Sequence, residues 1–406
     1  MTNTPHIRPL DPSVESVSTD VVVVGARCAG AATAMLLAAA GHDVLMVDRA
    51  EFPSDTLSTH AIARTGVVQL HRWGLLSTVV ASGAPEIRDV KFHIDGTSEG
   101  RAIKDRHGVD HLVAPRRHIL DPILQDAART AGADMRTGVT IEGVHRSDDG
   151  RVTGVRGRDR DGRPMSIGAR IVIGADGLRS RVARAVGAPM VEVRPASGAA
   201  HYAYFAGDWD AMEYYLGDRV LAGIFPTHAG EACIWVCSPE EWAIERRHRH
   251  DSLDRAFDAM VADAAPELAE RLHEYTRMSG TRGMMRIPNH VRGPVGPGWA
   301  LVGDAGYHRD AITGHGISDA FRDAELLAAA VDDVLDGRCT EADALAAYRC
   351  ERDVMLREIF EITCEMCSFP ASDRFIELQK QLGTAIDAQS AVLAARPTPA
   401  TALVPA

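Results

Sequence analysis

A run of β-branched residues that leads directly into a glycine-rich turn places the strongest constraint on the fold. Val21–Val24 is a continuous apolar segment, typical of a parallel strand buried on both faces, and the sequence GARCAG follows at once over residues 25–30. Ala31–Ala40 is rich in good helix formers, and Val44–Val47 is a second apolar strand. This order predicts a βαβ unit at the start of a doubly wound, mostly parallel sheet.

The turn has a chemical use as well as a structural one. The N-terminus of a helix offers unpaired N–H groups and a positive dipole to a pyrophosphate, and Asp48 lies at the distance expected of a residue that binds an adenosine ribose. Gly25 permits the tight turn and Gly30 permits close helix packing, but Arg27 replaces the middle glycine of the dinucleotide fingerprint. The alternative is a glycine-rich turn that only reverses the chain and binds nothing. Arg49 is expected either to contact a phosphate or to be an exposed arginine, and the sequence does not favour one of the two.

The rest of the chain predicts a mixed α/β architecture in several segments. We expect helices over 58–80 and 115–131, hairpins between 139 and 173, a helix from near Ser180, and a strand at 299–302 that returns to the first sheet. Aromatic and β-branched pieces between 189 and 288 predict a separate antiparallel sheet. The predicted organisation is a discontinuous Rossmann-like domain (19–80, 112–188 and 289–335), a substrate domain with an antiparallel sheet (81–111 and 189–288), C-terminal helices (336–395), and flexible ends (1–18 and 396–406).

Composition excludes several classes of protein. Asp and Glu outnumber Lys and Arg by 56 to 44 in the 406 residues, a formal charge of −12, so nucleic acid is not an expected partner. No secretory signal and no apolar run of transmembrane length is visible. Seven cysteines without regular spacing favour a reducing cytoplasm, and Cys364 and Cys367 are expected to be packing residues, with no metal site. The oligomeric state, monomer or homodimer, stays open.

Two further motifs narrow the class of protein that the sequence indicates. Asp176-Gly177 with Ser180 follows the strand at 171–173, and Gly303-Asp304 follows the strand at 299–302, with a helix opening after Thr313. Together with the first turn, in this order, these blocks resemble the FAD-binding fold of the para-hydroxybenzoate hydroxylase superfamily, over a span from Val21 to about Ala330. The resemblance implies FAD as the cofactor. It also implies NAD(P)H as a transient electron donor, because only one dinucleotide fingerprint is present.

The resemblance also implies roles for individual residues. Asp304 would bind the ribityl chain, and the backbone amides that start the late helix would face the pyrimidine end of the flavin and stabilise the negative charge of the reduced ring. Arg117 and Arg64 resemble residues that reach the cofactor from neighbouring helices, although surface salt bridges explain them equally well. The expected cofactor-binding residues are Gly25, Arg27, Cys28, Ala29, Gly30, Asp48, Arg49, Arg64, Arg117, Asp176, Gly303, Asp304, Gly314, Gly316 and Ile317.

Candidate catalytic and substrate-binding residues are fewer. His60 and His315 would lie near the flavin, where either could donate or accept a proton near neutral pH, and a purely structural histidine is the alternative for each. Tyr202, Tyr204 and Tyr215 are candidates for a wall that covers a small-molecule substrate, with ordinary sheet packing as the alternative.

Two departures from the family pattern leave the reaction open. Ala183 stands where the D-G-x-x-S block normally ends in arginine, and Asp310-Ala311 replaces a Pro-Pro pair of the hydroxylases, which resembles the geranylgeranyl-reductase and halogenase branches. The first hypothesis is an NAD(P)H-dependent monooxygenase that uses O2 to hydroxylate or epoxidise an apolar or aromatic small molecule through a flavin C4a-hydroperoxide. The second is a flavin-dependent double-bond reductase. Two alternatives are weaker: a halogenase and a non-catalytic flavin sensor. The halogenase lacks support because the W-x-W-x-I-P motif is missing and no lysine precedes Lys91.

Overall fold

The structure is a computed structural model that describes residues 15–94 and 96–398. Its first large sheet has the strand order β17-β18-β8-β1-β2-β5, in which the strands from β18 to β5 run parallel. The β6–β7 hairpin extends this sheet by pairing antiparallel with β8. The strands are β1 (Glu15–Val24), β2 (Val44–Val47), β5 (Asp134–Arg136), β6 (Thr140–Arg146), β7 (Val152–Arg158), β8 (Pro164–Gly174), β17 (Val295–Gly296) and β18 (Trp299–Leu301).

The alternation of side chains in β1 explains how both faces of this sheet are covered. Val21 and Val23 pack into a core built with helices on one face, whereas Val22 and Val24 pack with the β6–β8 strands and with Val182 on the other. All four valines are buried, as the continuous β-branched run predicts. The first face is covered by α1 (Cys28–Ala39), α2 (Arg64–Arg72), α3 (Leu76–Ala81), α4 (Arg117–Thr130) and α9 (Gly316–Leu335), and the second carries α5 (Arg181–Val186).

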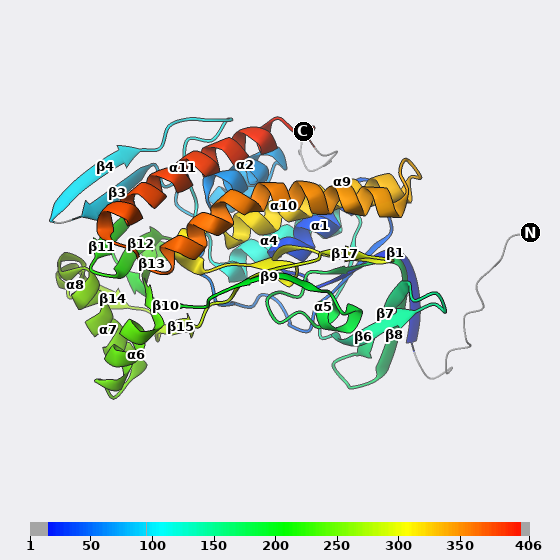
Figure 1. Cartoon of the computed structure of the whole chain (residues 1–406), viewed down its shortest axis with the longest axis horizontal. Helices are drawn as coiled ribbons and strands as arrows, with labels where there is room; N and C mark the ends of the chain where they lie inside the picture. Colours follow the sequence, from blue (N-terminus) through cyan, green and yellow to red (C-terminus); the bar gives the residue numbers. More distant parts are fainter. Residues whose placement is uncertain (1–14, 95, 399–406) are drawn as a thin grey trace, which may run out of the picture.

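A second large sheet lies at the other end of the molecule's long axis (Figure 1). Its order is β14-β10-β13-β12-β11-β3-β4, and β15 also pairs with β10. Its pairs are antiparallel except for β3 and β11, which run parallel. The strands are β3 (Asp89–Ile94), β4 (Thr97–Ala102), β10 (Gly198–Ala206), β11 (Met212–Gly217), β12 (Val220–Pro226), β13 (Glu231–Pro239), β14 (Thr276–Arg277) and β15 (Arg282–Met285).

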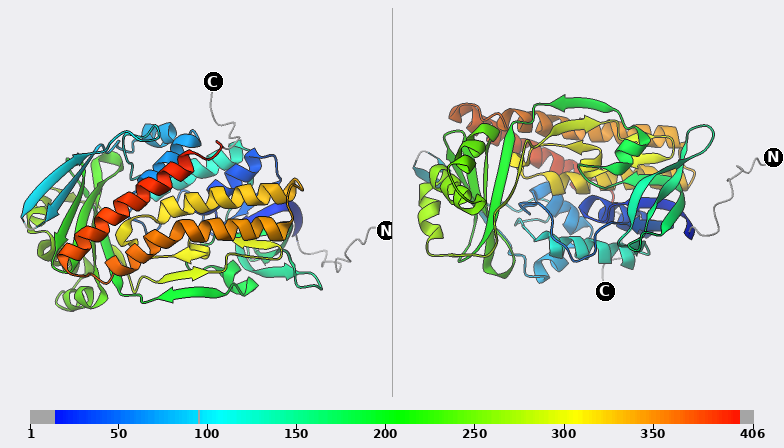
Figure 2. Two further views of the ribbon diagram at one scale, coloured as in Figure 1. Left: turned by 45° about the horizontal axis from the view of Figure 1, so that its top comes forward. Right: turned by 90° about the horizontal axis from the view of Figure 1, so that it is seen from below.

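Helices cover both faces of this second sheet. One face packs against α7 and α8, with α6 beside them, and the other against the long C-terminal helices. Figure 2 shows α9, α10 and α11 side by side, with α10 and α11 connecting the two ends of the molecule. A small third sheet has the order β19-β16-β9, and its strands alternate along the chain with strands of both large sheets. These elements are α6 (Glu240–His248), α7 (Leu253–Ala264), α8 (Pro266–Leu272), α10 (Glu341–Met366), α11 (Ser372–Ala394), β9 (Met190–Arg194), β16 (Asn289–Arg292) and β19 (Tyr307–His308).

The α/β fold class predicted from the sequence is confirmed, with two local corrections. The helix expected over 58–80 is wrong at its start: Ile62 bridges to Val113 in extended conformation and α2 begins only at Arg64. The N-terminus was expected to be flexible through residue 18, but β1 begins at Glu15 and pairs with β8, and residues 1–14 lie outside the described part. In the expected flexible tail, Arg72 donates to the carbonyl oxygens of residues 396 and 397, and residues 399–406 lie outside the described part.

The predicted domain boundaries stay predictions, although β9 pairs with β16 and not with the second large sheet. Within the described ranges, none of the helices is long and apolar enough to cross a membrane.

Candidate flavin-binding and active site

A cleft of about 760 Å³ opens at the carboxyl ends of the parallel strands and continues to the second sheet. Four strand ends contribute to it: Gly25 follows β1, Asp48 follows β2, Asp176 follows β8, and Asp304 follows β18. Ligands of doubly wound sheets bind at this edge. Segments that are hundreds of residues apart therefore meet at one site of a size suited to a cofactor.

The glycines of the first turn are required by close backbone approach. Gly25 has a φ of +107°, and a Cβ there would lie 2.3 Å from the carbonyl oxygen of Ala175. A Cβ at Gly30 would lie 1.7 Å from the carbonyl oxygen of Gly25. Both glycines thus hold α1 tightly against the ends of β1 and β8, and this leaves the N-terminus of α1 at the cleft.

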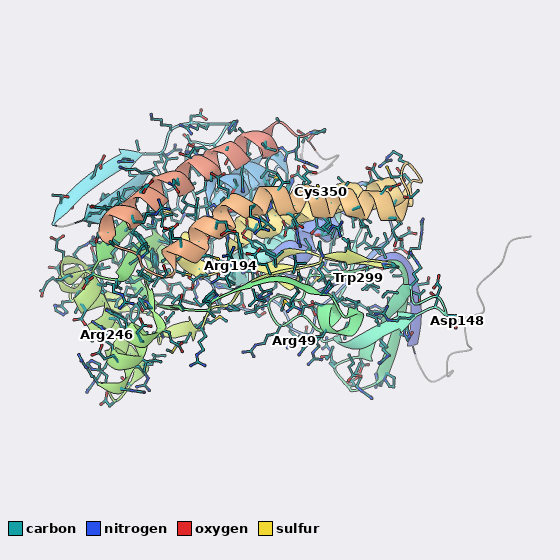
Figure 3. All side chains as sticks on the ribbon, viewed as in Figure 1. Arg49, Asp148, Arg194, Arg246, Trp299 and Cys350 are labelled. Carbon is teal, nitrogen blue, oxygen red and sulfur yellow. The ribbon has the colours of Figure 1, made fainter. Side chains whose placement is uncertain are left out.

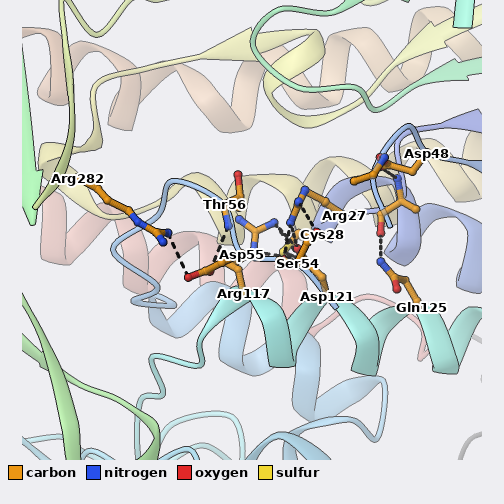
Figure 4. Close-up of polar contacts among 12 residues, drawn as sticks. Arg27, Cys28, Asp48, Ser54, Asp55, Thr56, Arg117, Asp121, Gln125 and Arg282 are labelled. Carbon is orange, nitrogen blue, oxygen red and sulfur yellow. Dashed lines mark hydrogen bonds and ion pairs between the residues drawn. The ribbon is translucent and has the colours of Figure 1, made fainter. Parts of the chain in front are cut away.

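Arg27, which replaces the middle glycine, does not fill the turn. Its guanidinium donates to Oδ2 of Asp121 at 2.6 Å and to the hydroxyl of Ser54 at 3.0 Å (Figure 4). Arg117 donates to Oδ1 of the same carboxylate at 3.0 and 2.9 Å. Asp121 is fully buried, so the two guanidinium groups share one buried carboxylate. Together the three side chains carry a net positive charge at the N-terminus of α1.

Asp48 is fixed in place by the turn that it faces. Its Oδ2 accepts the N–H of Ala26 at 2.8 Å, and its Oδ1 accepts the N–H of Ala50 at 2.8 Å. Gln125 donates to the carbonyl oxygen of Ala26 at 2.7 Å, which secures the same turn from α4. Each carboxylate oxygen keeps a lone pair for a ribose hydroxyl. Arg49 is exposed on the cleft and lies at the lower edge of the molecule in Figure 3.

The late motif forms the other end of the cleft. Gly303 begins a 3-10 turn (Gly303–Ala305) with a φ of +58°, and Asp304 lines the cleft on the same side as Arg117, whose pKa it helps to raise. Gly314 has a φ of +65°, and no atom lies within 4 Å of a Cβ built at Gly314 or Gly316. This open space at the N-terminus of α9, together with the carboxylates and the first turn, fits FAD.

His315 is built as a hydrogen-bond acceptor. Its Nδ1 lies 2.8 Å from the carbonyl oxygen of Thr313 and so carries the hydrogen. Burial, with the nearby Arg309 cation, lowers the pKa of His315 to about 4. The ring is therefore neutral at physiological pH, and its Nε2 can accept a hydrogen bond. The acid–base role that the sequence predicts for His315 stays a prediction.

Two expected cofactor contacts have other roles in the structure. Arg64 donates to the carbonyl oxygen of Val109 at 3.0 Å and pairs with Asp387 at 3.6 Å, and it is not among the residues lining the cleft. The prediction that Arg64 reaches the cofactor is therefore wrong. Gly66, two residues further on, permits close helix packing, since a Cβ there would lie 2.7 Å from Ser318 Oγ. Asp176 lines the cleft but also accepts N–H groups of the α5 turn at 2.6 and 3.2 Å.

His60 is the second histidine of the cleft and is held between the two sheets. It has a left-handed φ of +69°, is buried, and shares a hydrogen bond between Nε2 and the Tyr204 hydroxyl. Burial lowers its pKa well below the usual range, opposed by Asp55 and reinforced by the nearby arginines. Arg116 stacks over the Tyr204 ring at 3.6 Å and pairs with Asp55 at 3.1 Å. This network fixes a neutral histidine on the cleft wall.

The tyrosines predicted for the substrate wall divide between the two faces of the second sheet. Tyr202 lines the cleft, and its hydroxyl oxygen accepts the N–H of Ser58 at 3.2 Å. Tyr204 shares this face. The prediction for Tyr215 is wrong, because its side chain packs on the opposite face against α7 and donates to Glu213 at 2.6 Å. Ala61, Ala200, Met284, Ile287 and Ala311 supply the apolar part of the cleft lining, next to polar residues such as Ser58, His60 and Asp310.

Sequence reasoning missed several residues that shape the site. Asp121 could have been found, because it follows Arg117 by one helical turn and i,i+4 pairs of opposite charge interact. Asp310, noted only as a family marker, is buried on the cleft wall, and burial raises its pKa to about 6. No local signal pointed to Ser58, Arg309 or Arg179, which reach the cleft from loops.

The fold and the cleft together define a flavin-binding oxidoreductase. The sequence profile of the family described as "FAD binding domain" matches residues 18–363, so the chain belongs to this family and is an FAD-dependent oxidoreductase. The menaquinone reductase of Mycolicibacterium smegmatis is 28% identical over 323 residues, 76% of this chain and 75% of its own. The digeranylgeranylglycerophospholipid reductase 1 of Methanopyrus kandleri is 28% identical over 374 residues, 86% of this chain and 89% of its own. A solved structure, PqsL of Pseudomonas aeruginosa, described as a probable FAD-dependent monooxygenase, superposes with a TM-score of 0.75 at 25% identity, covering 89% of this chain and all of that one.

Proposed function

We propose that this protein uses NAD(P)H and FAD to reduce a carbon–carbon double bond in an apolar, isoprenoid-like small molecule. The observation that supports this best is the Tyr202 hydroxyl, set beside the apolar part of the cleft lining. Its oxygen accepts a backbone N–H from Ser58, while its own hydrogen has no acceptor among the residues that the structure describes. Two relatives that align over three quarters or more of this chain carry the names of reductases.

The chain would contribute a proton and a dry environment to this reaction. Reduced FAD, when bound, supplies the hydride to one carbon of the double bond. Tyr202 donates its proton to the adjacent carbon, and the N–H of Ser58 stabilises the negative charge left on the phenol oxygen. Ala200, Met284 and Ile287 exclude water and bind the apolar substrate.

The His60 network keeps Tyr202 in position. Tyr202 and Tyr204 are edge-to-face neighbours with ring centroids 5.7 Å apart, and His60 holds the Tyr204 hydroxyl. Because burial keeps His60 neutral, it adds no charge to the cleft lining. His60 is thus a positioning residue in this proposal and not the proton donor.

Anaerobic turnover tests the proposal. The protein is reduced with NADPH under nitrogen and mixed with a short unsaturated isoprenoid alcohol, which carries no quinone ring that could accept the electrons in its place. The flavin absorbance should return to that of the oxidised form, and mass spectrometry should find a product heavier by two hydrogens. Tyr215→Phe is the matched control for Tyr202→Phe, because Tyr215 lies on the far face of the same sheet. Failure of every unsaturated substrate to reoxidise the flavin without oxygen would contradict the proposal.

Oxygen insertion, the first hypothesis from the sequence, is the second candidate. It is supported by the likeness to PqsL, described as a probable monooxygenase, over the full length of that chain. The same reduced protein, exposed to oxygen with an aromatic substrate, would then yield a product heavier by one oxygen atom. Product from the aerobic arm alone would favour this candidate over double-bond reduction.

A further inference from the structure

The edge strand of the small third sheet exposes apolar side chains to solvent. Within residues 15–94 and 96–398, β9 (Met190–Arg194) pairs with β16 alone, and it lies at the periphery of the molecule in both views of Figure 2. The exposed fractions of Met190, Val191 and Val193 are 51%, 64% and 67%. Seven large hydrophobic residues are exposed in the described part of the chain, so this one strand of five residues holds three of them.

An edge strand offers unpaired N–H and C=O groups to any other strand, and proteins commonly block such edges with charged residues or proline. β4, the edge of the second large sheet, follows this rule, because it carries Glu99 and Arg101 and no large apolar residue. β9 has proline only just outside its ends, at Pro189 and Pro195. Its pairing with β16 is regular over residues 192–194, and the register shifts only before Glu192. The outer edge of residues 192–194 is therefore open, within the described part of the chain, to a further strand.

The charges on β9 are ordered so that the strand complements a copy of itself. Glu192 and Arg194 stand on either side of Val193. In an antiparallel pair centred on Val193, the glutamate of each copy lies opposite the arginine of the other, and the two valines lie opposite each other. Opposite charges directly across a strand pair are favourable, whereas like charges are not. This order of three residues therefore fits a second copy of the chain.

Helix α10 holds both charged side chains in place beside the open edge. Arg357 donates to Glu192 at 2.7 Å, and Arg194 donates to Glu361 at 2.9 Å. These two arginines and two glutamates have no net charge together, whereas the whole chain has a formal charge of −12. Two copies of so acidic a chain repel each other on average, so a neutral patch is where they can approach.

We propose that this protein forms a homodimer in which the β9 strands of two copies pair antiparallel about a two-fold axis at Val193. The two three-stranded sheets then join into one continuous sheet, with an α10 helix on each half. Such an interface uses the same surface of both copies and closes after two, so it produces a dimer and no longer chain of copies. Pairing satisfies the open edge and removes the Val193 side chains from water. The inference is independent of the proposed function.

The mass of the FAD-loaded protein in solution tests the inference. Sedimentation over a range of micromolar concentrations should show a species of twice the chain mass. Val193→Glu places like charges opposite each other at an exposed position, and it should raise the dissociation constant of the dimer at least tenfold. The control is Met278→Glu, which replaces another exposed residue beside β14 and should leave the constant unchanged. A protein that is monomeric throughout, that forms larger species in place of dimers, or whose dimer withstands Val193→Glu would overturn the inference.

Cysteine cross-linking tests the register of the pairing. The exposed Cys339 and Cys350 are first replaced by serine. Val193→Cys should then form a disulfide between chains on mild oxidation, because directly opposed residues of antiparallel strands have Cα atoms about 4.5–5.5 Å apart. Val191→Cys is the matched control: its side chain is as exposed, but its two copies would lie roughly 13 Å apart, beyond the reach of a disulfide. Equal cross-linking of the two variants, or none of Val193→Cys, would overturn the proposed pairing.

Discussion

Arg27 donates to the buried carboxylate of Asp121 at 2.6 Å and so turns its side chain away from the glycine-rich turn that it belongs to. This contact explains how a chain can lose the middle glycine of the dinucleotide fingerprint and still keep the turn open. The backbone at residue 27 is extended, with φ of −94° and ψ of −166°, which any residue adopts. A glycine is needed at the middle position of the fingerprint only when the side chain there would otherwise point at the phosphates.

Replacing Asp121 should destabilise the protein strongly. In Asp121→Asn, the guanidinium groups of Arg27 and Arg117 lose their shared anion, and removal of one partner from a buried ion pair costs about 3–5 kcal/mol. The free energy of unfolding in urea, measured on the FAD-free protein, checks this. Asp126→Asn on the exposed side of the same helix should cost less than about 1 kcal/mol. Equal effects of the two variants would contradict the role given to Asp121.

Replacing Asp48 should weaken FAD binding without unfolding the chain. In Asp48→Ala, a ribose hydroxyl loses its acceptor and the N–H groups of Ala26 and Ala50 lose theirs. Unmet hydrogen bonds of this kind cost about 1–3 kcal/mol, which corresponds to roughly a tenfold to hundredfold weaker Kd. FAD titration followed by flavin fluorescence measures it. Asp148→Asn in a remote exposed hairpin turn is the control and should bind FAD normally (Figure 3).

The parts of this site that could be predicted from sequence are those fixed by local backbone rules. Gly25, Gly30 and Asp48 follow from the geometry of one βα turn; the structure places Gly25 and Asp48 on the same cleft as Asp304, with Gly30 packed closely against Gly25. The orientation of a side chain in a sheet is set by strand register, which the sequence does not show. The prediction for Tyr215 was wrong for this reason, because neighbouring residues in a strand face opposite sides.

Removing the Tyr202 hydroxyl should slow product formation without slowing flavin reduction. Tyr202→Phe keeps the ring in the cleft lining but removes the proposed proton donor, and loss of a positioned acid typically costs about 10²–10⁴-fold in rate. Stopped-flow measurement of the two half-reactions separates the effects: reduction by NADPH unchanged, reoxidation by substrate slowed. If Tyr202→Phe turns over as fast as Tyr215→Phe, Tyr202 is not the donor.

Stability should fall on mild acidification. Burial lowers the pKa of His228, His290 and His315 to about 4 each, so the native state keeps them neutral while the unfolded chain protonates them below about 6.5. The unfolded state then binds more protons, and stability is lost as pH falls from about 6.5 to about 4. Asp310 has the opposite effect on stability. Burial raises its pKa to about 6, so below that pH the native state binds a proton there that the unfolded chain does not yet bind, and this offsets the contribution of one histidine over much of this window.

Urea unfolding as a function of pH measures this loss. His290→Gln should flatten the profile, since the ring that resists protonation is gone. His273→Gln, at an exposed position, should leave the slope unchanged. A profile that is flat in the unmodified protein between pH 6.5 and 4 would show that these histidines are protonated in the native state.

Long-range ion pairs and loop conformation set the limit of the sequence-based account. The loop before α2 was predicted as helix because its residues tolerate one, but Ile62 bridges to Val113 and Ser58 donates to Tyr202, contacts made across more than 50 residues. Arg64 was expected at the cofactor because of its motif, whereas Val109 and Asp387 hold it outside the cleft. Each of these depends on partners that no local pattern identifies.

The stoichiometry of FAD binding tests the central claim most directly, namely that Gly25, Asp48, Arg117 and Asp304 converge on one cofactor. The protein is stripped of any bound flavin and titrated with FAD while the visible absorbance and the flavin fluorescence are recorded. One FAD per chain should bind, with the perturbed spectrum of a ring removed from water. A protein that stays colourless and leaves the flavin spectrum unchanged throughout the titration would contradict the account.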